Sequence, residues 1–178
     1  NLAERGRLLK IAGVSHASAD LRKAEVAERQ ARSAKSALLQ QLLKFNSSCP
    51  VNIQTEYSDS LSTGSGISLF AYFAAAGKDD IDAVNPVIIG SDSLGERGKR
   101  AEIVGQEAAS ALVKEIASSA CVDHYLADQL VPFMAISGSG KILSSEITNH
   151  CLTNIFVVEQ FLGKLFEVDK EKKTVKSL

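Results

Sequence analysis

The stretch that most constrains the fold runs from Cys121 to Phe161, where two amphipathic helical segments flank a Ser/Gly-rich loop and a short strand. A histidine, His150, stands at the start of the second helix. Cap-type residues precede this helix, namely Ser145, Thr148 and Asn149. Apolar spacing predicts that its buried face consists of Leu152, Ile155, Phe156 and Val157.

The position of His150 allows two interpretations. A histidine at a helix start feels the positive end of the helix dipole, which favours the neutral imidazole and any bound anion. A neutral imidazole close to a phosphate can act as a nucleophile. The simpler interpretation is a capping or core histidine without chemistry. Spacing alone favours the simpler one, because a single histidine is weak evidence for a site.

The N-terminal half alternates between strand and helix patterns. A long helix is predicted over residues 21–45, followed by a break at Asn46–Pro50. Its apolar stripe consists of Ala27, Ala31, Ala34, Leu38 and Leu42. Strands are predicted at residues 7–14, 51–57, 67–76 and 86–90, with a polar turn at 15–20 that holds His16. The 67–76 strand is apolar on both faces and should be central.

A change of composition at Ser91–Arg100, which reads SDSLGERGKR, predicts a domain boundary near Gly98. The stretch contains a compact basic cluster of Arg97, Lys99 and Arg100. A solvated linker is the simpler interpretation of this cluster, and phosphate contact is the alternative. The chain would then consist of a small α/β domain, residues 1–98, and a second α/β unit, residues 99–178.

The second unit is predicted to contain helices at 100–119, from Asp123 onward and from the His150 region to about Leu162. A closing hairpin is predicted from residues 165–168 and 174–176. Within the middle helix, Tyr125 and Gln129 are four residues apart and Asp128 adjoins them, so all three can face one pocket. Leu126, Leu130 and Phe133 are predicted to pack on the core side. Pro132 should kink the helix, because it leaves the Asp128 carbonyl without its usual amide partner.

Composition excludes several classes of protein. The net charge of −1 gives no overall basic field, so any contact with RNA must come from a local patch. The three cysteines have no CxxC spacing, which disfavours a zinc site or a disulfide framework and fits a reducing cytoplasm. No apolar run is long enough to span a membrane, and no signal peptide is present. The segment SGSGK (Ser137–Lys141) fails the P-loop pattern at both ends.

Four segments in colinear order resemble the RNA 3'-terminal phosphate cyclases. They read HASADLRKAEVAERQARSA, LGERGKRAEIVGQEAA, ACVDHYLADQLVPFMA and SEITNHCLTNIFVVEQF, and together they cover nearly the whole chain. The resemblance implies a large domain of three repeated α/β units with a smaller α/β domain inserted before the last. Residues 1–98 would be the inserted domain, and residues 99–178 the third repeat. The chain, which starts at Asn1, would be roughly the second half of a longer protein.

The resemblance also implies a reaction. These cyclases convert an RNA 3'-terminal phosphate to a 2',3'-cyclic phosphate, using ATP and a divalent metal ion, Mg²⁺ or Mn²⁺. By the match of motifs, His150 would be the nucleophile that forms a histidyl-AMP. The adenylate pocket would be formed by Tyr125, Asp128 and Gln129. The arginines, glutamine and metal-binding glutamate of the family's N-terminal half are absent, so this chain alone is expected to be inactive without that half or a companion chain.

Two further interpretations stay open. One is a non-catalytic cyclase-like protein with a binding role in ribosome assembly. Those relatives lack the histidine, so His150 argues against this interpretation. The other is a plain α/β interaction domain whose likeness to the cyclases reflects the fold alone.

Overall fold

The computed structural model describes residues 1–44 and 48–178, which divide into two compact units. The four-stranded unit comprises Leu8–Tyr72 and Ile89–Ala117, and the three-stranded unit comprises Asn1–Arg7, Phe73–Ile88 and Ser118–Leu178. The predicted helix end at Phe45 and the first part of the break that follows it lie outside the described residues. Among the described residues, no helix has the length and apolar character needed to cross a membrane.

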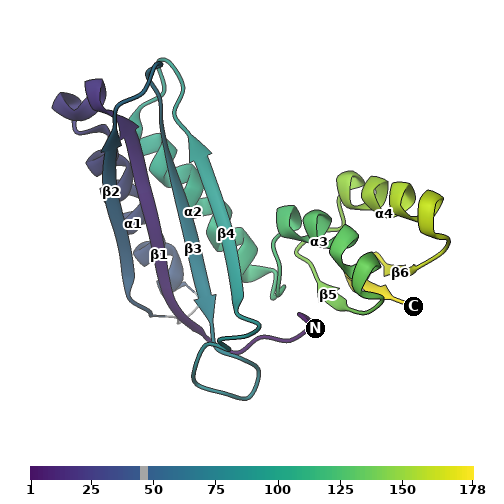
Figure 1. The fold of residues 1–178 in the computed structure, drawn as a ribbon. Helices are drawn as coiled ribbons and strands as arrows, with labels where there is room; N and C mark the ends of the chain where they lie inside the picture. Colours follow the sequence, from purple (N-terminus) through teal and green to yellow (C-terminus); the bar gives the residue numbers. More distant parts are fainter. Residues whose placement is uncertain (45–47) are drawn as a thin grey trace. The chain divides into compact units, whose positions relative to one another are not determined.

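The sheet of the four-stranded unit has the order β2-β1-β3-β4. Its strands are β1 (Leu8–Ser18), β2 (Val51–Ser58), β3 (Ser65–Phe73) and β4 (Val87–Leu94). β1 and β2 are parallel, with Ile11 opposite Val51, and β3 runs against its two neighbours (Figure 1). The prediction that the third strand is central is confirmed.

Strand β1 is longer than predicted, and it includes His16. Its pairing with β2 continues to Ser18 opposite Ser58, so the strand includes residues 15–18 of the predicted turn. The polar side chain of Ser15 is fully buried, but its hydroxyl lies 2.8 Å from the Ala27 carbonyl oxygen and 2.9 Å from Gln30 Oε1. Because this hydroxyl is satisfied, a polar residue can continue the strand.

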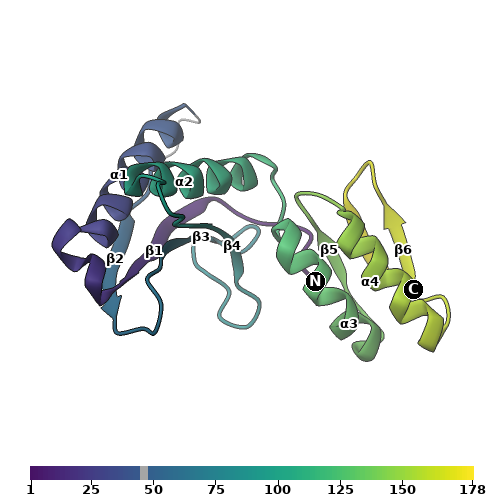
Figure 2. The ribbon, with the colours of Figure 1, turned by 90° about the horizontal axis from the view of Figure 1, so that it is seen from above.

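Two helices cover one face of this sheet (Figure 2). A short 3₁₀ helix, η1 (Ala19–Ala24), leads into α1 (Val26–Leu43), and α2 (Ala101–Ala117) packs beside α1. The predicted stripe of α1 is buried as expected, from Ala27 to Leu42. The two helices approach so closely that a Cβ at Gly105 would lie 2.2 Å from the Gln30 carbonyl oxygen.

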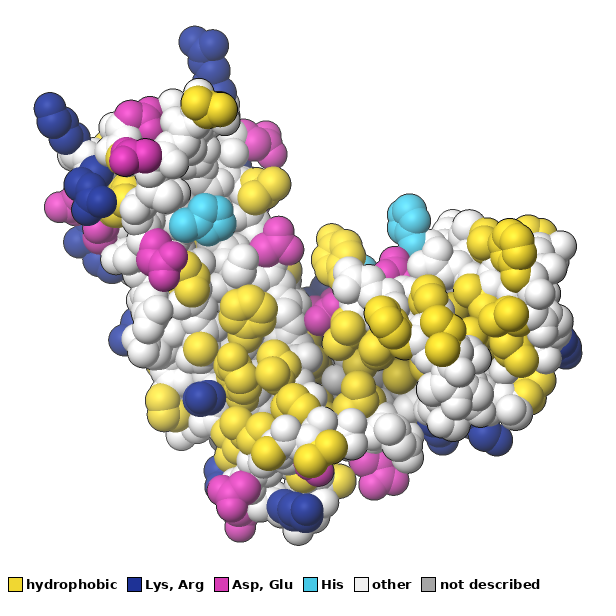
Figure 3. Space-filling model, viewed as in Figure 1, with side chains coloured by type: hydrophobic (Ala, Val, Ile, Leu, Met, Phe, Trp, Pro, Cys, Tyr) yellow, Lys and Arg dark blue, Asp and Glu magenta, His cyan; other side chains and the backbone are white. Residues whose placement is uncertain are grey.

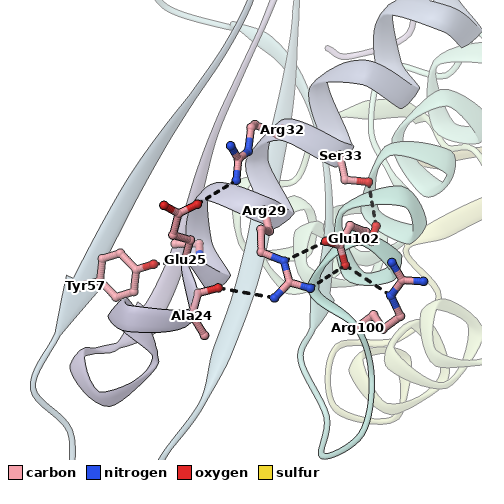
Figure 4. A network of polar contacts seen from close by, with 9 residues as sticks. Ala24, Glu25, Arg29, Arg32, Ser33, Tyr57, Arg100 and Glu102 are labelled. Carbon is pink, nitrogen blue, oxygen red and sulfur yellow. Dashed lines mark hydrogen bonds and ion pairs between the residues drawn. The ribbon is translucent and has the colours of Figure 1, made fainter.

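The structure places α2 in the four-stranded unit, so the unit ends at Ala117 and not at the predicted boundary near Gly98. The reason is packing: Val104, Ala108 and Leu112 are buried. Arg29 of α1 also donates two hydrogen bonds to the Glu102 carboxylate, at 2.8 and 3.0 Å (Figure 4). The change of composition at 91–100 therefore marks a loop inside one unit.

The three-stranded unit contains two helices and a small sheet of order β5-β7-β6. Its elements are α3 (His124–Ser137), β5 (Lys141–Leu143), α4 (Asn149–Leu162), β6 (Phe166–Asp169) and β7 (Thr174–Ser177). β7 is antiparallel to both neighbours, which confirms the predicted closing hairpin. The core includes Val131 of α3, Ile155 of α4 and Val175 of β7. Both units combine helices with a sheet, as the predicted α/β class requires.

Three apolar residues predicted to be buried are exposed. Phe133 is 69% exposed, Phe156 61% and Val157 46%. The core sides of α3 and α4 are occupied by smaller residues such as Ala127 and Cys151. We call Phe133, Ile136, Phe156, Val157 and Phe161 the outer apolar set; all five are exposed on α3 or α4. Figure 3 shows hydrophobic side chains gathered over these helices.

Candidate active site

His150 is the second residue of α4, and its side chain is exposed. Thr148 is the N-cap, and its hydroxyl oxygen accepts a hydrogen bond from the Cys151 amide at 3.1 Å. The capping function thus belongs to Thr148, and the core position belongs to Cys151, which is fully buried. Both simpler interpretations of His150 lose their support, because the imidazole neither fills the core nor caps the helix.

Asp128 lies on α3 at the contact with α4. Its backbone carbonyl accepts a hydrogen bond from Asn154 Nδ2 at 3.0 Å. This is the carbonyl that the missing amide of Pro132 would leave unpaired, as the sequence predicts. A side chain from the neighbouring helix replaces the lost donor and joins the two helices at a defined position.

The Asp128 carboxylate lies close enough to the start of α4 to influence Cys151. Burial raises the pKa of the Cys151 thiol, and the negative charge of Asp128 raises it further. Cys151 directly follows His150 in the chain. The hydrogen bond from Asn154 thus places Asp128, one of the predicted site residues, against α4, the helix that carries His150.

Tyr125 and Gln129 lie on the exposed side of α3. The Tyr125 side chain is 59% exposed, and its ring contacts the His124 ring with centroids 4.1 Å apart. Tyr125 is therefore not a core residue, and its ring is accessible to a ligand. The roles of Tyr125, Asp128 and Gln129 in binding adenylate stay predictions.

The predicted metal ion lacks a ligand set in the part of the chain that the structure describes. Residues 1–44 and 48–178 contain no cluster of three or more His, Cys, Asp or Glu side chains that could hold a metal. The three cysteines are free, and two of them, Cys121 and Cys151, are buried. Burial raises the pKa of both thiols, which keeps them in the form that binds metal poorly.

Residues 3–117 match the family described as RNA 3'-terminal phosphate cyclase (RTC), insert domain. The chain belongs to the RNA 3'-terminal phosphate cyclase family. The match to this cyclase family ends at the last residue of α2, which is also where the four-stranded unit ends. The family match and the packing of α2 on α1 both indicate that α2 is part of the same unit as the four strands.

Curated relatives of this cyclase-family chain are named RNA 3'-terminal phosphate cyclase. That of Pyrococcus abyssi is 48% identical over 164 residues, which cover 92% of this chain and 42% of the relative. The relative from Thermococcus gammatolerans is 47% identical over 160 residues, covering 90% and 41%. That of Sulfurisphaera tokodaii is 40% identical over 173 residues, covering 97% and 45%. The chain therefore spans less than half the length of these relatives.

Sequence reasoning missed one residue of the candidate site, Asn154. The available signal was the proline inside α3, which predicts an unpaired carbonyl at Asp128 but not which donor replaces the amide. Asn154 lies 26 residues from Asp128 in the chain. Only the packing of α4 on α3 brings the two together.

Proposed function

We propose that this chain is the C-terminal part of an ATP-dependent RNA 3'-terminal phosphate cyclase and that His150 is its nucleophile. One observation carries the proposal: in a chain with cyclase relatives, the histidine of the NHCLTN motif has an exposed side chain at the start of a helix that another residue caps. A backbone that is already capped leaves the imidazole available for a substrate.

The reaction follows from this nucleophile in three steps. An imidazole nitrogen of His150 attacks the α-phosphorus of ATP, pyrophosphate leaves, and a phosphoramidate bond to AMP forms. An oxygen of the RNA 3'-phosphate then attacks the same phosphorus, which breaks the bond to histidine and transfers AMP to the RNA. The neighbouring 2'-hydroxyl finally attacks the 3'-phosphorus, loses its proton, and displaces AMP to close the 2',3'-cyclic phosphate.

The α3 residues would bind the adenylate beside His150. The exposed Tyr125 ring offers a face on which adenine can stack, and such stacking is worth roughly 1–3 kcal/mol. Asp128 and Gln129 offer polar groups to the nucleotide. Asn154 would keep α3 and α4 in the alignment that holds these groups near His150.

The divalent ion does not fit the residues present. No cluster of three suitable side chains occurs in the described residues, so its ligands would come from the remainder of the protein. The chain also has no cluster of arginines near His150 in the sequence that could neutralise the phosphates, although nucleotidyl transfer depends on such charges.

The N-terminal part of the same protein would cover the outer apolar set and complete the site. The side chains of the outer apolar set are exposed on two helices of a small unit, and the chain accounts for only 42% of the Pyrococcus abyssi relative. The purified chain alone should therefore fail to cyclise a 3'-phosphorylated RNA, and adding the N-terminal part should restore turnover. Full turnover by the chain alone would disprove this dependence.

The nucleophile itself is tested by incubating the complete protein with α-labelled ATP. The wild type should acquire a covalent, acid-labile label, and His150→Ala should not. The matched control is His16→Ala, which removes the exposed histidine of β1 and should leave labelling intact. Because Thr148 caps α4, His150→Ala should preserve the fold, which circular dichroism would verify. Persistent labelling of a folded His150→Ala protein would move the nucleophile elsewhere.

A further inference from the structure

A cavity of about 580 Å³ opens in the four-stranded unit, and none of the residues assigned to catalysis lines it. Its wall comes from the start of α1, from residues 63–65 at the start of β3, and from the 95–100 loop between β4 and α2. β1 leads into η1 and α1, and β4 leads into α2, so the cavity lies where strands end and helices begin. Ligands of open α/β sheets bind at the carboxyl ends of strands in this way.

The charged residues of the lining are mostly basic. Four of them, Arg29, Arg97, Lys99 and Arg100, are basic, and one, Glu96, is acidic. Three of the four are the basic cluster that the sequence shows at 97–100. The chain as a whole carries a net charge of −1, so this positive lining is a local property of the cavity.

Two of the four basic side chains form close ion pairs with carboxylates of the same chain. Arg29 donates to both carboxylate oxygens of Glu102, and Lys99 forms an ion pair with Glu107. Arg100 is 74% exposed, and its Nε lies 3.6 Å from Glu102 Oε2, which is a loose contact (Figure 4). The Arg97 side chain is exposed, and within the described residues no ion pair holds it. Arg97 and Arg100 are therefore the side chains that a ligand could recruit.

Two glycines shape the 95–100 loop: Gly95 lets it pack closely on Ser65, and Gly98 leaves its backbone accessible. The Gly95 amide donates to the Ser65 carbonyl at 2.9 Å, and a Cβ at Gly95 would lie 2.2 Å from Ser65 Oγ. Gly98 has a φ of +83°, a conformation that favours glycine, and it turns the loop toward α2. Because no atom lies within 4 Å of the place where a Cβ of Gly98 would be, an anion can approach this part of the loop and the two arginines together.

We propose that this cavity binds a backbone phosphate of an RNA chain through Arg97 and Arg100. Guanidinium groups form paired, charge-assisted hydrogen bonds with phosphate oxygens. None of the described residues that line the cavity is aromatic, so a base has no ring on which to stack. The site would therefore hold the substrate by its backbone, without reading sequence. The choice of RNA rests on the proposed function.

The test is titration of the ¹⁵N-labelled chain with a short single-stranded RNA, following the amide signals of Gly95, Gly98 and Ala101. All three should shift, and to the same extent with or without a 3'-terminal phosphate. In Arg97→Gln/Arg100→Gln the binding should weaken. The slope of log affinity against log salt should fall by about 0.7, because one phosphate of a single strand is no longer neutralised. Arg32→Gln, an exposed arginine of α1 outside this cavity, is the control and should bind as the wild type does.

Three outcomes would overturn the proposal. The first is RNA binding that causes no shifts at the three amides. The second is that Arg32→Gln weakens binding as much as the double variant does. The third is that ATP binds at these amides as tightly as RNA, which would indicate a mononucleotide site. His150→Ala should retain the RNA shifts. Loss of ATP labelling with RNA binding intact, or the reverse, would therefore separate failure of the catalytic proposal from failure of this one.

Discussion

The Nδ2 atom of Asn154 on α4 lies 3.0 Å from the backbone carbonyl oxygen of Asp128 on α3, and it donates the hydrogen bond that Pro132 withholds. A proline inside a helix removes the amide donor of this carbonyl, which usually hydrogen-bonds to water instead while the helix kinks. Here the replacement donor comes from the helix that carries His150. One contact thus satisfies a backbone group and fixes the alignment of two helices.

Replacing Asn154 should lower the free energy of unfolding only while Pro132 is present. Asn154→Leu should destabilise the chain by about 1–3 kcal/mol, because the Asp128 carbonyl loses its partner in a half-buried place. Adding Pro132→Ala restores a backbone amide and should recover most of that loss. Urea unfolding of the four members of this double-mutant cycle measures the coupling. Additive effects of the two substitutions would contradict the assigned role of Asn154.

Removing the ring of Tyr125 should affect the nucleotide and not the fold. Because the side chain is 59% exposed, Tyr125→Ala should change unfolding free energy little, whereas ATP binding by the complete protein should weaken by roughly 1–3 kcal/mol. Calorimetric titration with ATP measures the loss. Tyr125→Phe keeps the ring and is the matched control, which should bind nearly as the wild type does. Wild-type affinity in Tyr125→Ala would remove Tyr125 from the pocket.

A side chain at position 105 should disrupt the four-stranded unit. The added Cβ of Gly105→Ala would meet the Gln30 carbonyl oxygen at 2.2 Å and the Ala34 amide nitrogen at 2.9 Å, so α1 and α2 must separate. Overpacking of this kind costs typically about 1–3 kcal/mol. Gly64→Ala, whose Cβ would meet no atom within 4 Å, is the control and should be tolerated. Thermal unfolding compares the two, and equal melting temperatures would contradict the packing argument.

The Arg29–Glu102 pair should make stability sensitive to acid. The hydrogen bonds from Arg29 lower the pKa of Glu102 from 4.5 to about 2. The pKa of Glu102 is lower in the folded state than in the unfolded state. The stabilisation that the ion pair gives to the folded state is therefore complete above pH 4.5 and is lost as the pH falls toward 2. Glu102→Gln and Arg29→Gln should therefore both show a shallower fall in stability across this window, measured by urea unfolding. A slope equal to that of the wild type in either variant would contradict the assignment.

The sequence by itself determined the local structure and the family. Apolar spacing predicted α1, α4, the central strand β3 and the closing hairpin, because these patterns depend on neighbours along the chain. Four colinear segments, among them the one around His150, indicated the cyclase family, which the family match over residues 3–117 and the similarity to curated cyclases confirm. Pro132 even marked the Asp128 carbonyl as a group in need of a donor.

Only the tertiary structure decided which surfaces meet. It placed α2 against α1, joined Asn154 to Asp128, exposed Phe133 and Phe156, and gathered the basic cluster at 97–100 around a cavity with residues 63–65. Each of these facts concerns groups far apart in the chain. Periodicity shows that a helix has an apolar side, but the partner of that side is set by which long-range packing buries the most surface without steric conflict.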